Sequence, residues 1–212
     1  MPDNESHPLL ITGPTESQCA TLVLAHGAGG AMDSPFLNRM AEQLAGAGIK
    51  VVRFEFPYMR ARREQGAKKG PDPPEVLQQT WFEVIQALGG GPGLVIGGKS
   101  LGGRVASLIA DEACVRGLVC LGYPFHPPGR PAQLRTHHLA ALQTPTLILQ
   151  GARDPFGTRE EAGGTKLSPR IRIAWVEDGD HSWKPRKGSG RTEEQNLREA
   201  ASLIAEFVRE LR

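Results

Sequence analysis

The sequence predicts an α/β protein built on a mostly parallel, open sheet of about six to seven strands with helices on both faces. Continuously apolar runs recur along the chain, as in strands that are buried on both faces. These runs alternate with segments in which apolar residues repeat at helical spacing. The chain has 212 residues, a length that suits one domain with one core. We therefore expect a single domain over 1–212, with 1–8 flexible.

The elements can be predicted in chain order. The expected strands are 9–12 at one edge, 20–25, 49–54, 93–96, 117–121, 146–150 and 171–176. The expected helices are 36–44, 76–88, 101–112 and 192–208. Thr192 and Gln195 have the spacing of a capping box at the start of the last helix. In such sheets ligands bind beyond the carboxyl ends of the strands, so the loops that follow strands should share one edge.

The composition bears on the cellular location of the protein and on the partners it can have. The formal net charge of +2 gives no global signal for binding nucleic acid. The chain has an odd number of cysteines. Cys114 and Cys120 lie in apolar surroundings and are expected to be reduced core residues, which favours a cytoplasmic location. The start of the chain shows no signal-peptide pattern. No apolar run approaches the roughly 20 residues of a membrane span, so no membrane partner is expected.

The residues 98–102 read Gly-Lys-Ser-Leu-Gly and lie between an apolar run and a helical pattern. This Gly-x-Ser-x-Gly pattern is typical of a nucleophile elbow, a tight strand-to-helix turn that exposes the serine hydroxyl. Ser100 is therefore the candidate nucleophile. The overlapping residues 93–100 also match a phosphate-binding loop, which needs a strand before its first glycine. Here 89–92 read Gly-Gly-Gly-Pro, and 94–96 are strand-like, so nucleotide binding is the weaker alternative.

A serine hydroxyl needs a general base, and the base needs an orienting acid. Asp154 follows the expected strand 146–150, and His181 follows the expected strand 171–176. Their order after Ser100 is the order nucleophile, acid, histidine. Asp154 could instead only initiate a turn before a proline. Asp178 and Asp180 are rival acids, but they stand beside the histidine in sequence.

The glycine-rich residues 26–30 follow the first buried strand and read His-Gly-Ala-Gly-Gly. A tetrahedral intermediate carries an oxyanion that backbone N–H groups must bind. One N–H should come from the residue after the nucleophile, Leu101, and the other from this loop, at Ala28. We expect His26 to shape the loop rather than to act as acid or base.

The segments 26–30, 54–59, 98–104 and 122–129, together with Asp154 and the residues around His181, carry a family resemblance. Over 22–207 the chain resembles the serine α/β-hydrolases, and among them the small lidless dienelactone-hydrolase-like and testis-expressed-protein-30-like hydrolases. The resemblance implies an α/β-hydrolase fold without a lid domain, with Ser100 as nucleophile, Asp154 as acid and His181 as base. It implies no cofactor and no metal. Dienelactone hydrolases use cysteine where this chain has Ser100, so their substrate is not carried over.

The expected function is hydrolysis of a carboxylic ester or thioester through an acyl-enzyme intermediate. The substrate would be a small molecule. The main alternative is an interaction or scaffold protein with little or no turnover. The segment 57–74 is rich in arginine and lysine, and it is either a loop that attracts an anionic substrate or merely a solvated loop. The oligomeric state is left open. Further candidate substrate contacts are Lys99, Tyr58, Tyr123, His126 and Trp183.

Overall fold

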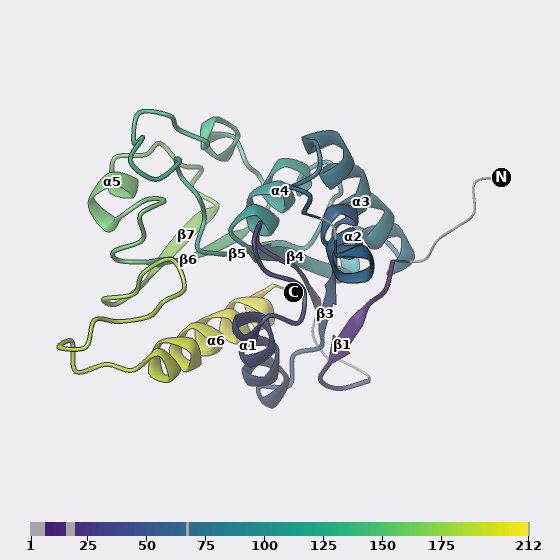
Figure 1. The fold of residues 1–212 in the computed structure, drawn as a ribbon, viewed down its shortest axis with the longest axis horizontal. Coiled ribbons are helices and arrows are strands. Elements are labelled where there is room, and N and C mark those ends of the chain that lie inside the picture. The colour runs from purple at the N-terminus through teal and green to yellow at the C-terminus, as the bar shows by residue number, and fades with distance from the viewer. Residues whose placement is uncertain (1–6, 16–19, 67, 212) are drawn as a thin grey trace.

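The computed structural model describes residues 7–15, 20–66 and 68–211. In this part of the chain one sheet has the strand order β1-β3-β2-β4-β5-β6-β7 (Figure 1). The strands are β1 (Leu10–Thr12), β2 (Thr21–Ala25), β3 (Val51–Phe54), β4 (Leu94–Lys99), β5 (Gly117–Leu121), β6 (Thr146–Gly151) and β7 (Ile171–Val176). β1 pairs antiparallel with β3, and every other neighbouring pair is parallel. The predicted fold class and its edge strand are confirmed. Most of the start predicted to be flexible, residues 1–6, lies outside the described residues.

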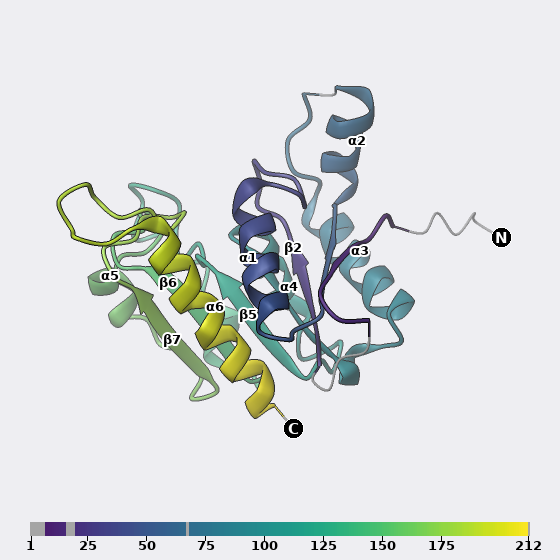
Figure 2. The same cartoon turned by 90° about the horizontal axis from the view of Figure 1, so that it is seen from below.

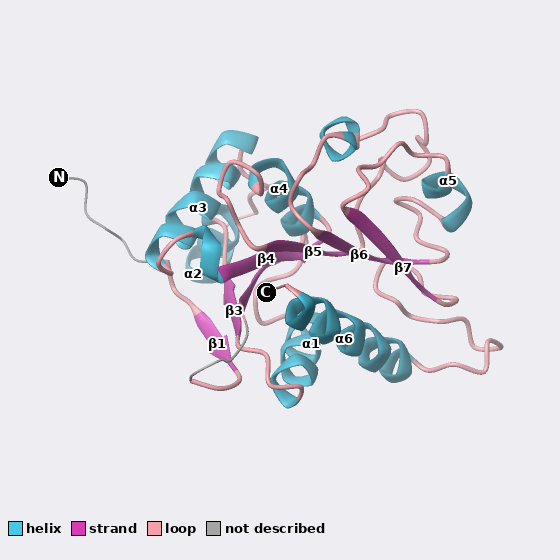
Figure 3. Cartoon of the chain, turned by 180° about the vertical axis from the view of Figure 1, so that it is seen from behind, coloured by secondary structure: helices cyan, strands magenta, loops and turns pink. Residues whose placement is uncertain are grey.

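Helices cover both faces of this sheet, as Figure 3 shows with the sheet nearly edge-on. They are α1 (Pro35–Gly46), α2 (Pro57–Gln65), α3 (Pro74–Ala87), α4 (Leu101–Ile109), α5 (Arg159–Gly163) and α6 (Glu193–Glu210), with short 3₁₀ turns η1 (Gly91–Gly93) and η2 (His137–Ala140). α1 and α6 pack on one face, and α3 and α4 pack on the other. The predicted capping box is present, since the Thr192 side chain accepts from the Gln195 N–H.

The apolar runs are buried because each strand contributes to two cores. On one face Val23 and Ile96 belong to a core that includes Trp81 of α3. On the other face Leu22 and Val95 belong to a core with α1 and α6. Neighbouring residues of one strand point to opposite faces. A strand between two helical layers is therefore apolar at most of its positions, which explains the runs.

The segment 57–74 was predicted to be a loop, and this is wrong for its first half, which forms α2. Pro57 occupies the first helical position, where its fixed φ suits a helix. Tyr58 and Met59 are buried and anchor the helix, and Gly66 ends it in a left-handed conformation. The charged composition hid the two buried anchors from a periodicity argument. Figure 2 shows α2 projecting at one end of the molecule.

No lid domain is inserted between β5 and β6. The connection 122–144 holds only the turn η2 among its regular elements. The alternative of a phosphate-binding loop at 93–100 also fails. The residues between Gly93 and Gly98 belong to β4, so the flexible cradle that such a loop requires is occupied by a buried strand.

The cysteines differ in their surroundings. Cys120 is buried in β5, and burial raises the pKa of its thiol. Cys114 is exposed, with a positive φ of 50° in the turn after α4. The expectation of a core residue is correct for Cys120 and wrong for Cys114, because the turn carries the latter to the surface; Cys19 lies outside the described residues. None of the helices in the described part of the chain has the length and apolar character of a membrane span.

Candidate active site

Ser100 stands between the end of β4 and the start of α4. Its backbone has φ 50° and ψ −109°, a conformation that costs a non-glycine residue on the order of 1–3 kcal/mol. The turn is held because the Ser100 N–H donates to the Leu121 carbonyl oxygen at 3.0 Å. The sharp strand-to-helix turn predicted from the sequence is therefore present, with Ser100 at its apex.

Two glycines make this turn sterically feasible. A Cβ added to Gly98 would lie 2.3 Å from the Ala25 carbonyl oxygen. A Cβ added to Gly102 would lie 2.6 Å from the same oxygen and 2.7 Å from the His26 carbonyl oxygen. All three distances are far below van der Waals contact. The two glycines let the turn approach the end of β2, which brings the glycine-rich loop beside Ser100.

Asp154 and His181 are joined at the carboxyl ends of β6 and β7. The Asp154 side chain is fully buried. Its Oδ1 accepts from the Phe156 N–H at 2.9 Å, and its Oδ2 accepts from His181 Nδ1 at 2.7 Å. With the carboxylate held in this way, Nδ1 carries the proton and Nε2 of His181 is left as the basic nitrogen. The ring of Phe156 lies against the imidazole with centroids 4.3 Å apart.

Ser100 and His181 open onto the same cavity. It has a volume of about 450 Å³ and is lined by Gly27, Ala28, Gly29, Gly30, Ser34, Phe36, Lys99, Ser100, Phe156, His181 and Ser182. Of the residues predicted to contact a substrate, Lys99 lines this cavity. The rings of Phe36 and Phe156 were not predicted from the sequence to face the site. Phe156 could have been found from its position two residues after the candidate acid, whereas nothing local marked Phe36.

The loop 26–30 is held from below by side-chain hydrogen bonds. His26 is buried, and its Nδ1 donates to the Gly27 carbonyl oxygen at 2.7 Å while its Nε2 accepts from the Phe56 N–H at 3.1 Å. Burial lowers the pKa of His26, which keeps the ring neutral. The Tyr58 hydroxyl donates to the carbonyl oxygens of Ala28, at 3.1 Å, and Gly27, at 3.3 Å. His26 thus shapes the loop, as expected.

The candidate N–H donors lie on either side of this arrangement. Leu101 is the first residue of α4, and the first N–H groups of a helix have no acceptor within the helix. Ala28 lines the cavity from the opposite loop. The backbone N–H groups of Leu101 and Ala28 thus come from the two segments that flank Ser100.

Four residues proposed as substrate contacts do not line this cavity: Tyr58, Tyr123, His126 and Trp183. All four are buried. The Tyr123 hydroxyl donates to the Arg135 carbonyl oxygen at 2.9 Å, and the Trp183 ring packs edge-on behind Phe36 with centroids 5.0 Å apart. This cavity therefore does not support the prediction that these four residues contact a substrate directly.

The basic residues of 57–74 are largely engaged within the protein. Arg63 pairs with Asp33 and with the buried Glu55. Lys69 pairs with the buried Asp72 at 2.9 Å. Asp72 in turn accepts from the Tyr58 N–H at 2.7 Å, so these charges fasten α2 to the body of the protein. They offer little support for the prediction that this segment attracts an anionic substrate.

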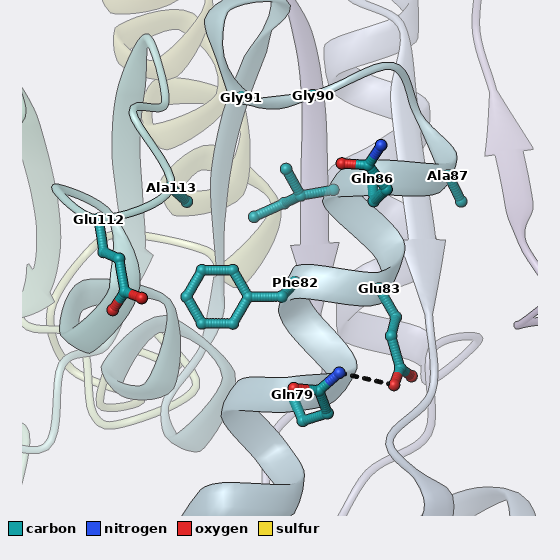
Figure 4. Close-up of a pocket in the computed structure, with 10 residues that line it drawn as sticks. Gln79, Phe82, Glu83, Gln86, Ala87, Gly90, Gly91, Glu112 and Ala113 are labelled. Atoms are coloured by element: carbon teal, nitrogen blue, oxygen red, sulfur yellow. Dashed lines mark hydrogen bonds between the residues drawn. The ribbon is translucent and has the colours of Figure 1, made fainter.

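A larger cavity of about 720 Å³ lies at the opposite edge of the sheet. It is formed by the second half of α3, by Gly90 and Gly91 before β4, and by the turn before β5 (Figure 4). Phe82 projects into it, and the Gln79 amide donates to Glu83 at 2.9 Å. Its lining has no serine, cysteine or histidine. The candidate chemistry therefore belongs to the smaller cavity. Among the described residues no group of three or more His, Cys, Asp or Glu side chains is arranged to hold a metal ion.

Comparisons with known proteins agree with this architecture. The model of a family described as "Alpha/beta hydrolase domain" matches residues 18–209. Dienelactone hydrolase from Anabaena variabilis is similar with a TM-score of 0.68 and 21% identity, covering 96% of this chain and 92% of that chain. Est1E from Butyrivibrio proteoclasticus, with ferulic acid bound, has a TM-score of 0.71 and 15% identity, covering 96% and 94%. XC6422 from Xanthomonas campestris, a serine hydrolase without a lid, has a TM-score of 0.64 and 19% identity, covering 95% and 88%. At these identities the likeness concerns the fold.

Proposed function

The chain belongs to the α/β-hydrolase family, and from this premise we propose that it hydrolyses carboxylic esters or thioesters with Ser100, His181 and Asp154. The observation that carries the proposal is the pairing of His181 Nδ1 with the buried Asp154 at 2.7 Å, beside a cavity that His181 shares with Ser100. A carboxylate that fixes the proton on Nδ1 leaves Nε2 free to accept the serine proton. The strained turn at Ser100 adds support, since strain of this kind gathers at functional sites.

The proposed reaction has two halves. Ser100 Oγ attacks the acyl carbon while its proton passes to His181 Nε2, and the resulting oxyanion accepts hydrogen bonds from the Leu101 and Ala28 N–H groups. The bond from the acyl carbon to the leaving oxygen or sulfur then breaks, and His181 returns the proton to the leaving group. Water then attacks the acyl carbon of the acyl-enzyme while its proton passes to His181 Nε2. The bond from the acyl carbon to Ser100 Oγ breaks, and His181 returns the proton to Oγ, which releases the carboxylic acid and restores Ser100.

The size and lining of the cavity limit the range of possible substrates. Its volume of about 450 Å³ falls within the ordinary range of small-molecule sites. The rings of Phe36 and Phe156 supply apolar surface for an acyl or aryl group. We therefore propose a small, partly apolar acyl compound. An anionic group on the substrate is not part of the proposal, because the basic side chains of α2 have partners of their own.

A substrate panel tests the proposal. Purified protein is assayed with p-nitrophenyl esters and acyl thioesters of graded chain length. We expect turnover of short acyl chains, loss of that turnover in Ser100→Ala, and wild-type turnover in Ser202→Ala, which changes a serine exposed on α6. A folded protein that turns over no member of the panel would favour the alternative of an interaction module.

A further inference from the structure

Lys99 connects the strand that carries the nucleophile to the loop that carries the base. It is the last residue of β4 and directly precedes Ser100. Its Nζ donates to the backbone carbonyl oxygen of His181 at 2.7 Å, across 82 residues of sequence. Nζ and the imidazole both border Gly122, since a Cβ built there would be 2.9 Å from Nζ and 3.3 Å from His181 Nδ1 and Cε1.

The Lys99 ammonium is held in an unfavourable environment. Burial lowers the pKa of Lys99 to about 8, although the carboxylates of Asp154 and Asp180 act in the opposite direction. Among the described residues no carboxylate lies within 4.0 Å of the ammonium. The Phe36 ring centroid lies 5.5 Å away. Holding a part-buried charge without an ion pair costs stability, so a lysine at this position calls for a functional explanation.

We propose that Lys99 is a positioning residue that holds the backbone of His181 so that its imidazole faces Ser100. The inference rests on the proposed function of the site. The His181 side chain is tied to Asp154 and its backbone is tied to Lys99, so the residue is fixed from two directions. Hydrogen bonds from a charged donor are roughly twice as strong as neutral ones. Misplacing a catalytic group by about 1 Å can cost on the order of 100-fold in rate.

The charged and titratable groups around Lys99 come from two segments. Asp154 lies on the loop after β6, and Asp180 and His181 lie on the loop between β7 and α6. The Asp180 carboxylate is itself occupied, since its Oδ1 accepts from the N–H groups of Ser182, at 2.8 Å, and Lys184, at 3.0 Å. Proton loss from Lys99 above about pH 8 would leave a weaker neutral donor to His181.

Two variants and one control test the role. Lys99→Met removes the donor, Lys99→Arg keeps a charge at every accessible pH, and Lys166→Met changes a lysine that is exposed before β7. The readouts are hydrogen–deuterium exchange of 178–184 and the pH dependence of kcat for an aryl acetate. We expect faster exchange in Lys99→Met, with kcat lowered on the order of 10- to 100-fold and KM nearly unchanged. The wild-type kcat should fall above about pH 8, and Lys99→Arg should lack that fall.

The outcomes separate the two proposals. A Lys99→Met protein with wild-type kcat, or with wild-type exchange in 178–184, would overturn the positioning role. Wild-type protein that cannot hydrolyse the ester would count against the proposed function alone. The exchange measurement would then decide whether Lys99 holds the His181 loop.

Discussion

Asp154 Oδ2 and His181 Nδ1 lie 2.7 Å apart although 27 residues separate them in the sequence. They meet because β6 and β7 are parallel neighbours, so the loops that follow them leave the sheet at the same edge. Asp154 is fully buried, whereas the His181 side chain is 23% exposed. The acid is thus enclosed behind the base, and the base reaches the cavity.

Replacing the acid should disable the base without unfolding the protein. Asp154→Asn keeps the size of the side chain but removes the charge that holds the proton on Nδ1, so kcat should fall on the order of 10⁴-fold if the proposed function is right. Steady-state kinetics with an aryl ester measure the change, and Glu160→Gln on the exposed surface of α5 serves as the control. A loss of less than tenfold would contradict the role given to Asp154.

The Tyr58 hydroxyl should support catalysis from outside the cavity. Burial raises the pKa of Tyr58 to about 12, so the hydroxyl stays a donor to the carbonyl oxygens of Gly27 and Ala28. Tyr58→Phe should lower stability by about 1 kcal/mol and lower kcat severalfold, because the loop that offers the Ala28 N–H is loosened. Tyr123→Phe is the matched control. Its hydroxyl bonds to Arg135, so this variant should lose similar stability and keep its kcat. Equal kcat values in Tyr58→Phe and Tyr123→Phe would show that the Tyr58 hydroxyl does not support catalysis.

The turn at Ser100 predicts that replacing different glycines by alanine changes the stability of the protein by different amounts. Gly98→Ala would force a Cβ to within 2.3 Å of the Ala25 carbonyl oxygen at a φ of 155°, so we expect severe destabilisation or failure to fold. Gly163→Ala in α5 meets nothing within 4 Å, and it should leave stability unchanged or raise it by up to about 1 kcal/mol. Thermal unfolding of both variants measures this contrast. A Gly98→Ala protein as stable as wild type would show that the turn can relax.

Lys99 should carry a cost in stability that depends on pH. Burial lowers its pKa from 10.5 to about 8, so between these values the unfolded chain binds more protons than the folded one. The Lys99 contribution to the free energy of unfolding therefore rises with pH across that interval. Lys99→Met should be more stable than wild type at pH 7, and the difference should shrink as pH rises from about 8 to about 10. Denaturant unfolding of both proteins at neutral pH and at about pH 10 tests this difference in stability. A Lys99→Met protein that is less stable than wild type at neutral pH would contradict a stability cost of the Lys99 charge.

Much of the fold follows from local patterns in the sequence. The strands were predictable because a strand between two helical layers is apolar over most of its length, as β5 is throughout and β4 is up to Lys99. The chain order of Ser100, Asp154 and His181 was informative because parallel strands deliver their following loops to one edge. α2 was missed because its charged residues outnumber its buried anchors, Tyr58 and Met59.

The lining of the site was less predictable than the residues proposed to react. Whether an aromatic side chain faces a cavity or fills the core depends on loop packing, which the sequence pattern does not encode. Trp183 and Phe36 are in contact, yet only Phe36 lines the cavity. The hydrogen bond from Lys99 to His181 joins segments that are far apart in sequence, so no local signal predicts it.

The central claim is that the hydroxyl of Ser100 is made reactive by His181 and Asp154. Intact-mass analysis after treatment with a fluorophosphonate tests it most directly. We expect one covalent adduct per wild-type chain, mapped to Ser100, with no adduct in Ser100→Ala and labelling that is slowed strongly in His181→Ala. A folded wild-type protein that stays unlabelled, or one labelled equally fast without His181, would contradict it.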